Sequence, residues 1–277
     1  DSTRAFETYV ESNRLKWSTL SFSLDRLAEE YTALVRQFEE LADTAPAVVP
    51  DDPAPIFIVG LPRSGKTTLE GMLARHPDMA ALGELSIFPA LIHDSLLAGR
   101  DHGPPQDQLL RQIGAEYLRR TRELTGEGRR TIDTMPPNFR HVGFIRVALP
   151  NARIIHARRE PFSHSVALFQ KYFGQPGYEF TYEPGVLAGA YRLYRGLMAR
   201  WEALVPGFVL ETDLSAVLAN PIAGMGQILD FCGLSVDQGC FQPFVAEPVI
   251  GGGDRPPSSD ARARLAPYEA ILGSVRE

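Results

Sequence analysis

This chain of 277 residues contains little cysteine, no long apolar run and no excess of basic residues. Its two cysteines, Cys232 and Cys240, are too few for a disulfide framework or a cysteine zinc site, and they suit a reducing compartment. No apolar run of roughly 18 residues and no basic-then-apolar leader occurs in the sequence. The net charge of −6 argues against a general nucleic-acid binder. We therefore expect a cytoplasmic protein whose partners are neither membranes nor nucleic acids.

The residues that are present are typical of a globular protein. Hydrophobic residues make up 44% of the chain and charged residues 22%, which is enough apolar material for a full core. The length fits one large domain or two small ones. Because the first residue is Asp1 rather than Met, we expect a fragment or a processed form of a longer polypeptide.

The most informative stretch runs from Pro55 to Leu73, PIFIVGLPRSGKTTLEGML. A short apolar run ends at Gly60, a loop follows, and apolar residues at helical spacing come after Lys66. A strand, a glycine loop and a helix start in this order form an anion cradle, because the first N–H groups of a helix lack intrahelical partners and carry partial positive charge. The stretch also fits the nucleotide-binding pattern G-x-x-x-x-G-K-[ST]. We predict that this loop binds a phosphate-like group.

Periodicity predicts the fold class. Residues 3–41 form one apolar face at helical spacing, which packs on the flank of the domain or belongs to an upstream helical array. Strands alternate with helices along the rest of the chain, and this alternation implies a parallel sheet covered on both faces. We predict an α/β, P-loop NTPase-like three-layer fold with a central parallel sheet flanked by helices. The predicted strands are residues 56–59, 130–133, 152–157 and 207–211, and the main helices are residues 86–98, 108–124, 139–149, 161–169, 186–204 and 225–231.

Polar residues follow three of these strands, at the carboxyl ends where open parallel sheets bind ligands. A nucleoside triphosphatase needs an acid there for Mg²⁺. Asp133 could supply it, although its strand is short and weakly apolar. The best apolar strand, residues 152–157, ends instead in Arg158 and Arg159, and arginines bind anions and repel a metal. We interpret the site as two separated anion clamps on one nucleotide, without a metal.

Five segments in this order resemble the sulfotransferases, most closely the bacterial type often fused to tetratricopeptide repeats and related to tyrosylprotein sulfotransferases. These segments are residues 62–67, 76–77 with 83–84, 133–139, 150–161 and 229–234. The resemblance implies one domain over residues 1–277, with an N-terminal helical extension at 1–48 and a P-loop core and C-terminal donor-capping segment at 55–277. It also implies a co-substrate, 3′-phosphoadenosine 5′-phosphosulfate, and a small-molecule or peptide acceptor with a hydroxyl or phenol group.

The resemblance assigns roles to individual residues. Arg63 and Lys66 neutralise charge on the bridging and leaving oxygens, and Glu84 matches the carboxylate that deprotonates the acceptor. No metal is implied, because a sulfuryl group carries less charge than a phosphoryl group. The residues implied in donor binding are Arg63, Ser64, Gly65, Lys66, Thr67 and Thr68 in the loop, Arg159 with Ser163 or Ser165 at the 3′-phosphate, and Arg255 closing over the donor.

The sequence departs from the family pattern at four positions. Lys66 stands where the family loop has threonine, and Thr134 stands where the family has lysine. We hypothesise that Lys66 supplies the cation that position 134 no longer offers. At the 3′-phosphate clamp, Ala167 replaces the family's serine and Phe162 its arginine.

Two other functions remain open. Lys66 favours a P-loop kinase that uses ATP and Mg²⁺, whereas Ala167, Phe162 and Thr134 favour a catalytically decayed nucleotide-binding or scaffold protein on the same fold. His164 lies near Arg159 in the sequence, and we interpret it as a histidine on a helix surface.

Overall fold

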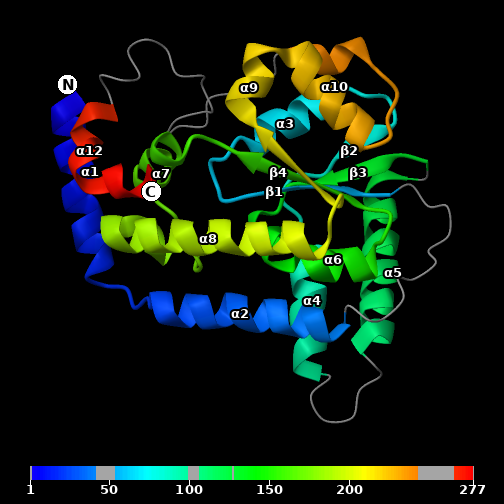
Figure 1. The fold of residues 1–277 in the computed structure, drawn as a ribbon, viewed down its shortest axis with the longest axis horizontal. Helices are drawn as coiled ribbons and strands as arrows, with labels where there is room; N and C mark the ends of the chain where they lie inside the picture. The colour runs from blue at the N-terminus through cyan, green and yellow to red at the C-terminus, as the bar shows by residue number, and fades with distance from the viewer. Residues whose placement is uncertain (1, 42–53, 99–105, 127, 243–264, 277) are drawn as a thin grey trace.

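The structure is a computed structural model, which describes residues 2–41, 54–98, 106–126, 128–242 and 265–276. Five strands form one all-parallel sheet in the order β2-β3-β1-β4-β5 (Figure 1). The predicted α/β fold with a central parallel sheet is thereby confirmed. The strands are β1 Ile56–Val59, β2 Met79–Ala81, β3 Arg130–Asp133, β4 Arg153–Arg158 and β5 Val209–Asp213.

Strand β1 lies in the middle of the sheet and is apolar along its whole length because both of its faces are covered. Successive side chains of a strand point to opposite faces. Ile56 and Ile58 accordingly join one hydrophobic cluster, and Phe57 and Val59 join the other, all at 0% exposure. The core therefore consists of two layers of side chains with the sheet between them.

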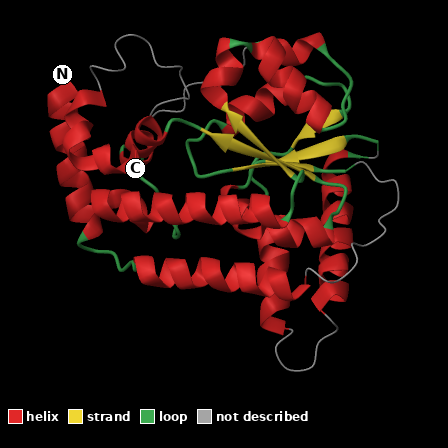
Figure 2. Ribbon diagram, in the orientation of Figure 1, coloured by secondary structure: helices red, strands yellow, loops and turns green. Residues whose placement is uncertain are grey.

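Helices cover both faces of the sheet (Figure 2). One face carries the helix that follows the glycine loop together with two helices from the C-terminal part of the core (Figure 1). These are α3 Lys66–Leu73, α9 Leu214–Ala219 and α10 Pro221–Phe231, with the short η3 Gln238–Phe241 beside them. The other face carries α4 Ile87–Ala98, α5 Gln106–Thr125, η1 Pro136–His141, α6 Val142–Ala148, α7 Pro161–Phe169, η2 Glu179–Tyr182 and α8 Pro184–Leu204.

The N-terminal segment forms two helices, α1 Ser2–Trp17 and α2 Leu24–Leu41, so the prediction of one helix over residues 3–41 was wrong. The Ser23 hydroxyl accepts a hydrogen bond from the Arg26 N–H, which caps the start of α2 and explains the break. α2 lies along α8, where Phe38 meets Trp201 edge to face at 5.5 Å (Figure 1). The N-terminal helices thus pack on the core, although the division of the chain into domains stays a prediction.

The last described segment returns to the N-terminus. Its short helices are η4 Ala266–Tyr268, α12 Glu269–Leu272 and η5 Gly273–Arg276. Tyr268 contacts Phe6 of α1 at 4.8 Å, so the two ends of the described chain lie together (Figure 1). Among the described residues, no helix combines the length and the apolar character that crossing a membrane requires.

Candidate functional site

Two glycines set the path of the loop after β1. Gly60 has φ 145° and Gly65 has φ 96°, conformations that side chains rarely adopt. A Cβ on Gly60 would lie 2.7 Å from the Ala157 carbonyl oxygen, and one on Gly65 would lie 2.2 Å from Leu214. Arg63, with φ 66°, is the one non-glycine residue of positive φ in the described part of the chain. The loop therefore sits tightly against β4 and α9, where its two glycines permit the turn and Arg63 holds a strained backbone conformation.

Two hydroxyl groups in this loop are buried without a hydrogen-bond partner among the described residues. They are Ser64 Oγ, in a residue that is 0% exposed, and Thr68 Oγ1, in a residue that is 1% exposed. Thr67, between them, is exposed. Buried hydroxyls are nearly always bonded in proteins, so two unbonded ones beside one helix start indicate a place for a polar ligand.

Lys66 begins α3, and only 5% of it is exposed. Its Nζ donates a hydrogen bond of 3.3 Å to the Leu61 carbonyl oxygen, so the ammonium group folds back over the loop. A buried ammonium beside the N–H groups of a helix start gives the loop a concentrated positive charge. The half-buried Arg63 adds a second cation.

The predicted second clamp lies on the neighbouring strand. β4 pairs with β1 so that Val59 lies opposite His156, and both strands end at the same edge of the sheet. Arg158, at the end of β4, forms an ion pair with Glu211 of β5. Arg159 follows and is half-buried. We keep Arg159 as the candidate ligand contact that the resemblance assigned to this clamp.

The start of α7 is occupied by a carboxylate of the chain itself. Glu160 accepts hydrogen bonds from the Phe162 N–H at 3.0 Å and the Ser163 N–H at 2.7 Å. The Ser163 hydroxyl donates to the Glu160 carbonyl at 3.1 Å and the residue is half-buried. The Ser165 hydroxyl donates to the Pro161 carbonyl at 2.8 Å in a residue that is 0% exposed. Of the two serines, Ser163 is thus the more accessible to a phosphate.

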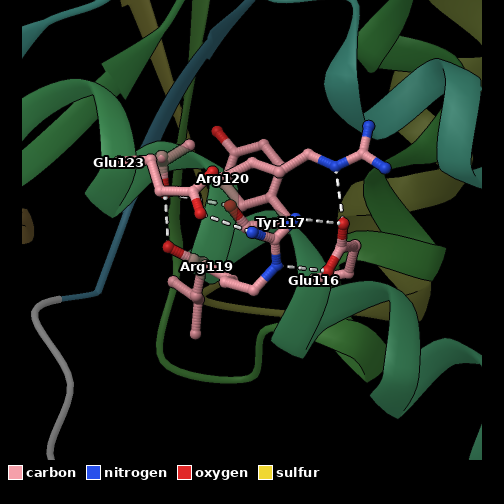
Figure 3. A network of polar contacts seen from close by, with 7 residues as sticks. Glu116, Tyr117, Arg119, Arg120 and Glu123 are labelled. Atoms are coloured by element: carbon pink, nitrogen blue, oxygen red, sulfur yellow. Dashed lines mark hydrogen bonds and ion pairs between the residues drawn. The ribbon is translucent and has the colours of Figure 1, made fainter.

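Asp133 is held in the interior at the end of β3. Tyr117 of α5 donates to Asp133 Oδ2 at 3.1 Å, and the Met135 N–H donates to Oδ1 at 2.9 Å. Burial raises the pKa of Asp133 to about 7. Around Tyr117, α5 carries surface ion pairs among Glu116, Arg119, Arg120 and Glu123 (Figure 3). A carboxyl group so enclosed and so bonded is suited to holding β3 and α5 together rather than to binding Mg²⁺.

Glu84 is exposed and follows β2. The turn that presents it is tied to α3, because the Gly83 N–H donates to Glu70 Oε1 at 2.8 Å. Burial raises the pKa of Glu70, and the charge of Glu84 raises it further. Burial also raises the pKa of Tyr178 to about 12, and Glu84 again adds to the effect. Glu84 therefore lies within electrostatic range of both α3 and the aromatic segment near η2.

The structure shows a residue that the sequence did not single out, Glu70, whose carboxylate holds the turn at Gly83. It also corrects the interpretation of His164. His164 is 1% exposed, and its Nε2 lies 2.8 Å from the Pro62 carbonyl oxygen. Burial lowers its pKa to about 3, and the positive charges of Arg159, Lys66 and Arg63 lower it further. His164 is thus not on a helix surface. Its spacing of four residues from the apolar Leu168 was the available sequence signal.

The structure brings the loop residues, Arg159 and Ser163 to one edge of the sheet. Ser165 is turned into the core, and Arg255 lies outside the described residues. β1 and β4 are neighbours in the middle of the sheet. From β1 the chain continues toward the β2 edge of the sheet, and from β4 it continues toward the β5 edge, so the connections diverge between these two strands. Ligands of open α/β sheets bind at such switch points. Fold and site together define an α/β protein of the P-loop type with cations at this edge.

The particular family follows from the sequence comparison. The sulfotransferase family model matches residues 55–238, and this chain belongs to that family. The resemblance to the sulfotransferases is thereby confirmed, whereas the closer likeness to the tetratricopeptide-repeat and tyrosylprotein types stays a prediction. Membership of the family supports a transferase.

Individual relatives share part of this chain. An uncharacterized protein of Aquifex aeolicus (strain VF5) is 27% identical in an alignment of 256 residues that covers 84% of this chain and 33% of that protein. This chain therefore spans about a third of the length of that relative. The sulfotransferase domain of the Synechococcus PCC 7002 olefin synthase is 17% identical with a TM-score of 0.47, over 84% of this chain and 92% of that chain. Mouse sulfotransferase SULT7A1, complexed with PAP, is 14% identical with a TM-score of 0.40, over 74% and 66% respectively.

Proposed function

We propose that this protein transfers a sulfuryl group from 3′-phosphoadenosine 5′-phosphosulfate to a hydroxyl or phenol group of a small molecule or peptide. The observation that carries the proposal is the loop between β1 and α3. Together with the first turn of α3, it combines a buried ammonium group, Lys66, with two buried hydroxyls that have no hydrogen-bond partner among the described residues, Ser64 Oγ and Thr68 Oγ1. Such a loop suits a ligand that is anionic and accepts hydrogen bonds.

The donor has an anionic group at each end, and the site has a cation at two places. Lys66, Arg63 and Arg159 all act on the pKa of His164, so the loop and the end of β4 face a common region. In this proposal Ser64, Gly65, Thr67 and Thr68 bind the 5′-phosphosulfate together with Lys66. Arg159 and Ser163 bind the 3′-phosphate, and Arg255 closes over the donor.

The bound donor supplies an activated sulfuryl group. The chain must stabilise the negative charge that develops on the oxygen left behind, and Lys66 and Arg63 are the cations placed to do so. Preformed cations in a buried site are effective because no solvent has to reorganise around them. We propose that the transfer needs no metal ion, since the Asp133 carboxyl is already bonded to Tyr117 and Met135.

Glu84 is the proposed general base. Its exposure leaves it accessible to an acceptor, and the hydrogen bond between Gly83 and Glu70 fixes the turn from which it projects. A base must lie within hydrogen-bond reach of the hydroxyl proton that it removes. The aromatic segment that includes Tyr178 lies within the electrostatic range of Glu84 and is suited to line the acceptor side.

Calorimetry with two ligands tests this function. Adenosine 3′,5′-bisphosphate should bind in the presence of a chelator, whereas ATP should not bind more tightly when Mg²⁺ is added. Arg159→Gln provides the matched control, because it should weaken the bisphosphate and leave the affinity for adenosine 5′-monophosphate unchanged. Mg²⁺-dependent ATP binding would favour the P-loop kinase. If neither adenosine 3′,5′-bisphosphate nor ATP binds, the result would favour a catalytically decayed scaffold protein.

A further inference from the structure

A buried polar cluster lies behind the glycine loop, between β4, α7 and α8. It consists of His156, His164, Tyr191 and Tyr194, which are between 1% and 4% exposed. These four side chains line a cavity of about 90 Å³. Buried polar groups of this kind are ordered by the hydrogen bonds that they make.

His164 bonds directly to the backbone of the loop. Its Nε2 lies 2.8 Å from the Pro62 carbonyl oxygen, and its Nδ1 lies 3.3 Å from the Tyr191 hydroxyl. A carbonyl oxygen only accepts, so Nε2 carries the hydrogen and Nδ1 accepts from Tyr191. Burial holds the pKa of His164 at about 3, and this neutral tautomer therefore persists at every pH at which the protein would be assayed.

Tyr194 completes the cluster beside His156, with the two ring centroids 5.6 Å apart. Burial raises the pKa of Tyr194, and a hydrogen bond with the Leu61 backbone lowers it. The Tyr194 hydroxyl in turn bonds to His156 Nε2. On the loop itself, the Leu61 carbonyl oxygen, next to Pro62, accepts a hydrogen bond from Lys66 Nζ.

We propose that His164 is a positioning residue of the transfer reaction: from behind, it fixes Pro62 and thereby the loop that carries Lys66 and Arg63. The proposal rests on the proposed function for its effect on catalysis, and on the hydrogen bonds for its effect on the loop. A loop with three strained or glycine positions at residues 60, 63 and 65 needs such external support to keep one conformation. His164 acts through the Pro62 carbonyl and does not itself contact the donor.

A pair of substitutions at His164 separates the hydrogen bond from the bulk of the side chain. His164→Gln keeps an N–H donor near the Nε2 position, whereas His164→Leu removes the donor and keeps an apolar side chain of similar reach. We expect kcat of His164→Leu to fall about tenfold or more, because small misplacements of reacting groups are costly. His164→Gln should recover most of the rate, and both variants should keep the wild-type KM for the acceptor.

Hydrogen–deuterium exchange on the ligand-free protein gives a readout that does not depend on the donor. Exchange of the amides in residues 60–66 should be faster in His164→Leu than in the wild type, and close to the wild type in His164→Gln. Tyr191→Phe, which removes the bond to Nδ1, should show a smaller change in the same direction. Tyr268→Phe is the matched control, since its hydroxyl accepts from Gln170 at the C-terminal end of α7 rather than bonding to the loop, and it should leave exchange in 60–66 unchanged.

Failure of this inference can be told apart from failure of the proposed function. If the wild type binds no bisphosphate, the proposed function is wrong, and the exchange comparison still decides whether His164 holds the loop. Equal exchange in His164→Leu and the wild type would overturn the positioning role. So would faster exchange accompanied by an unchanged kcat in an active enzyme.

Discussion

Replacing Lys66 with methionine tests the central feature of the site. Methionine keeps most of the length of the side chain and removes its charge. If Lys66 stabilises the oxygen that leaves the sulfuryl group, kcat should fall by about 10²- to 10³-fold, or roughly 3–4 kcal/mol, as when a single preorganised donor is removed from an active site. The KM for the acceptor should change little, because the lost interaction belongs to the transition state.

The same substitution should leave the fold intact. Lys66 is 5% exposed, and the hydrogen bond from its Nζ to the Leu61 carbonyl oxygen, at 3.3 Å, is long for an ammonium group. Losing a hydrogen bond from a charged donor costs about 1.5–3 kcal/mol, but removing a buried charge relieves a desolvation cost of similar size. We therefore expect the free energy of unfolding to change by no more than about 1 kcal/mol in either direction. The substitution should therefore lower kcat strongly while leaving the stability of the fold nearly unchanged.

The assay is the initial rate of transfer of labelled sulfate from the donor to a set of phenols, read beside the thermal midpoint. A rate within threefold of the wild type, in a folded variant, would refute the role of Lys66. The hypothesis that Lys66 supplies the cation that position 134 no longer offers can be tested in parallel. Lys66→Thr should be slow, and Lys66→Thr with Thr134→Lys should recover rate if the two positions supply one cation. Near-normal turnover of Lys66→Thr alone would reject that compensation.

Three further predictions concern the base, the loop and the interior acid. Glu84→Gln should bind bisphosphate as the wild type does and transfer about 10²-fold or more slowly, and unchanged turnover would remove Glu84 as the base. Gly65→Ala should destabilise the protein and abolish bisphosphate binding because of the clash with Leu214, whereas Gly177→Ala, at the same φ of 96° but with nothing within 4 Å, should report the backbone strain alone. Because the pKa of Asp133 is raised from 3.8 to about 7, its contribution to stability is complete below about pH 4 and is lost as the pH rises through 7. The free energy of unfolding in urea should therefore fall by on the order of 2–3 kcal/mol between pH 5 and pH 8, and Asp133→Asn should remove this dependence.

The strand, loop and helix around Lys66 could be predicted from the sequence because their signals are local. An apolar run of four residues, two glycines and the spacing of Leu69, Met72 and Leu73 lie within one short stretch. The arginines after β4 were found in the same way, and parallel strands place their ends at one edge whatever the details of packing. Other elements carried no such signal. β2 has only three residues, Met79–Ala81, and was not predicted.

Which side chains face the ligand edge and which serve the core was decided by tertiary structure. Glu160, Ser165 and His164 follow one another within six residues, yet one caps α7, one bonds within the helix and one reaches back to Pro62. Hydrogen bonds across 102 residues of sequence depend on how α7 packs against β1, and no local pattern encodes that packing. The sequence by itself determined that an anion-binding loop exists. The tertiary structure decided what holds that loop, because burial and distance exist only once the elements have come together.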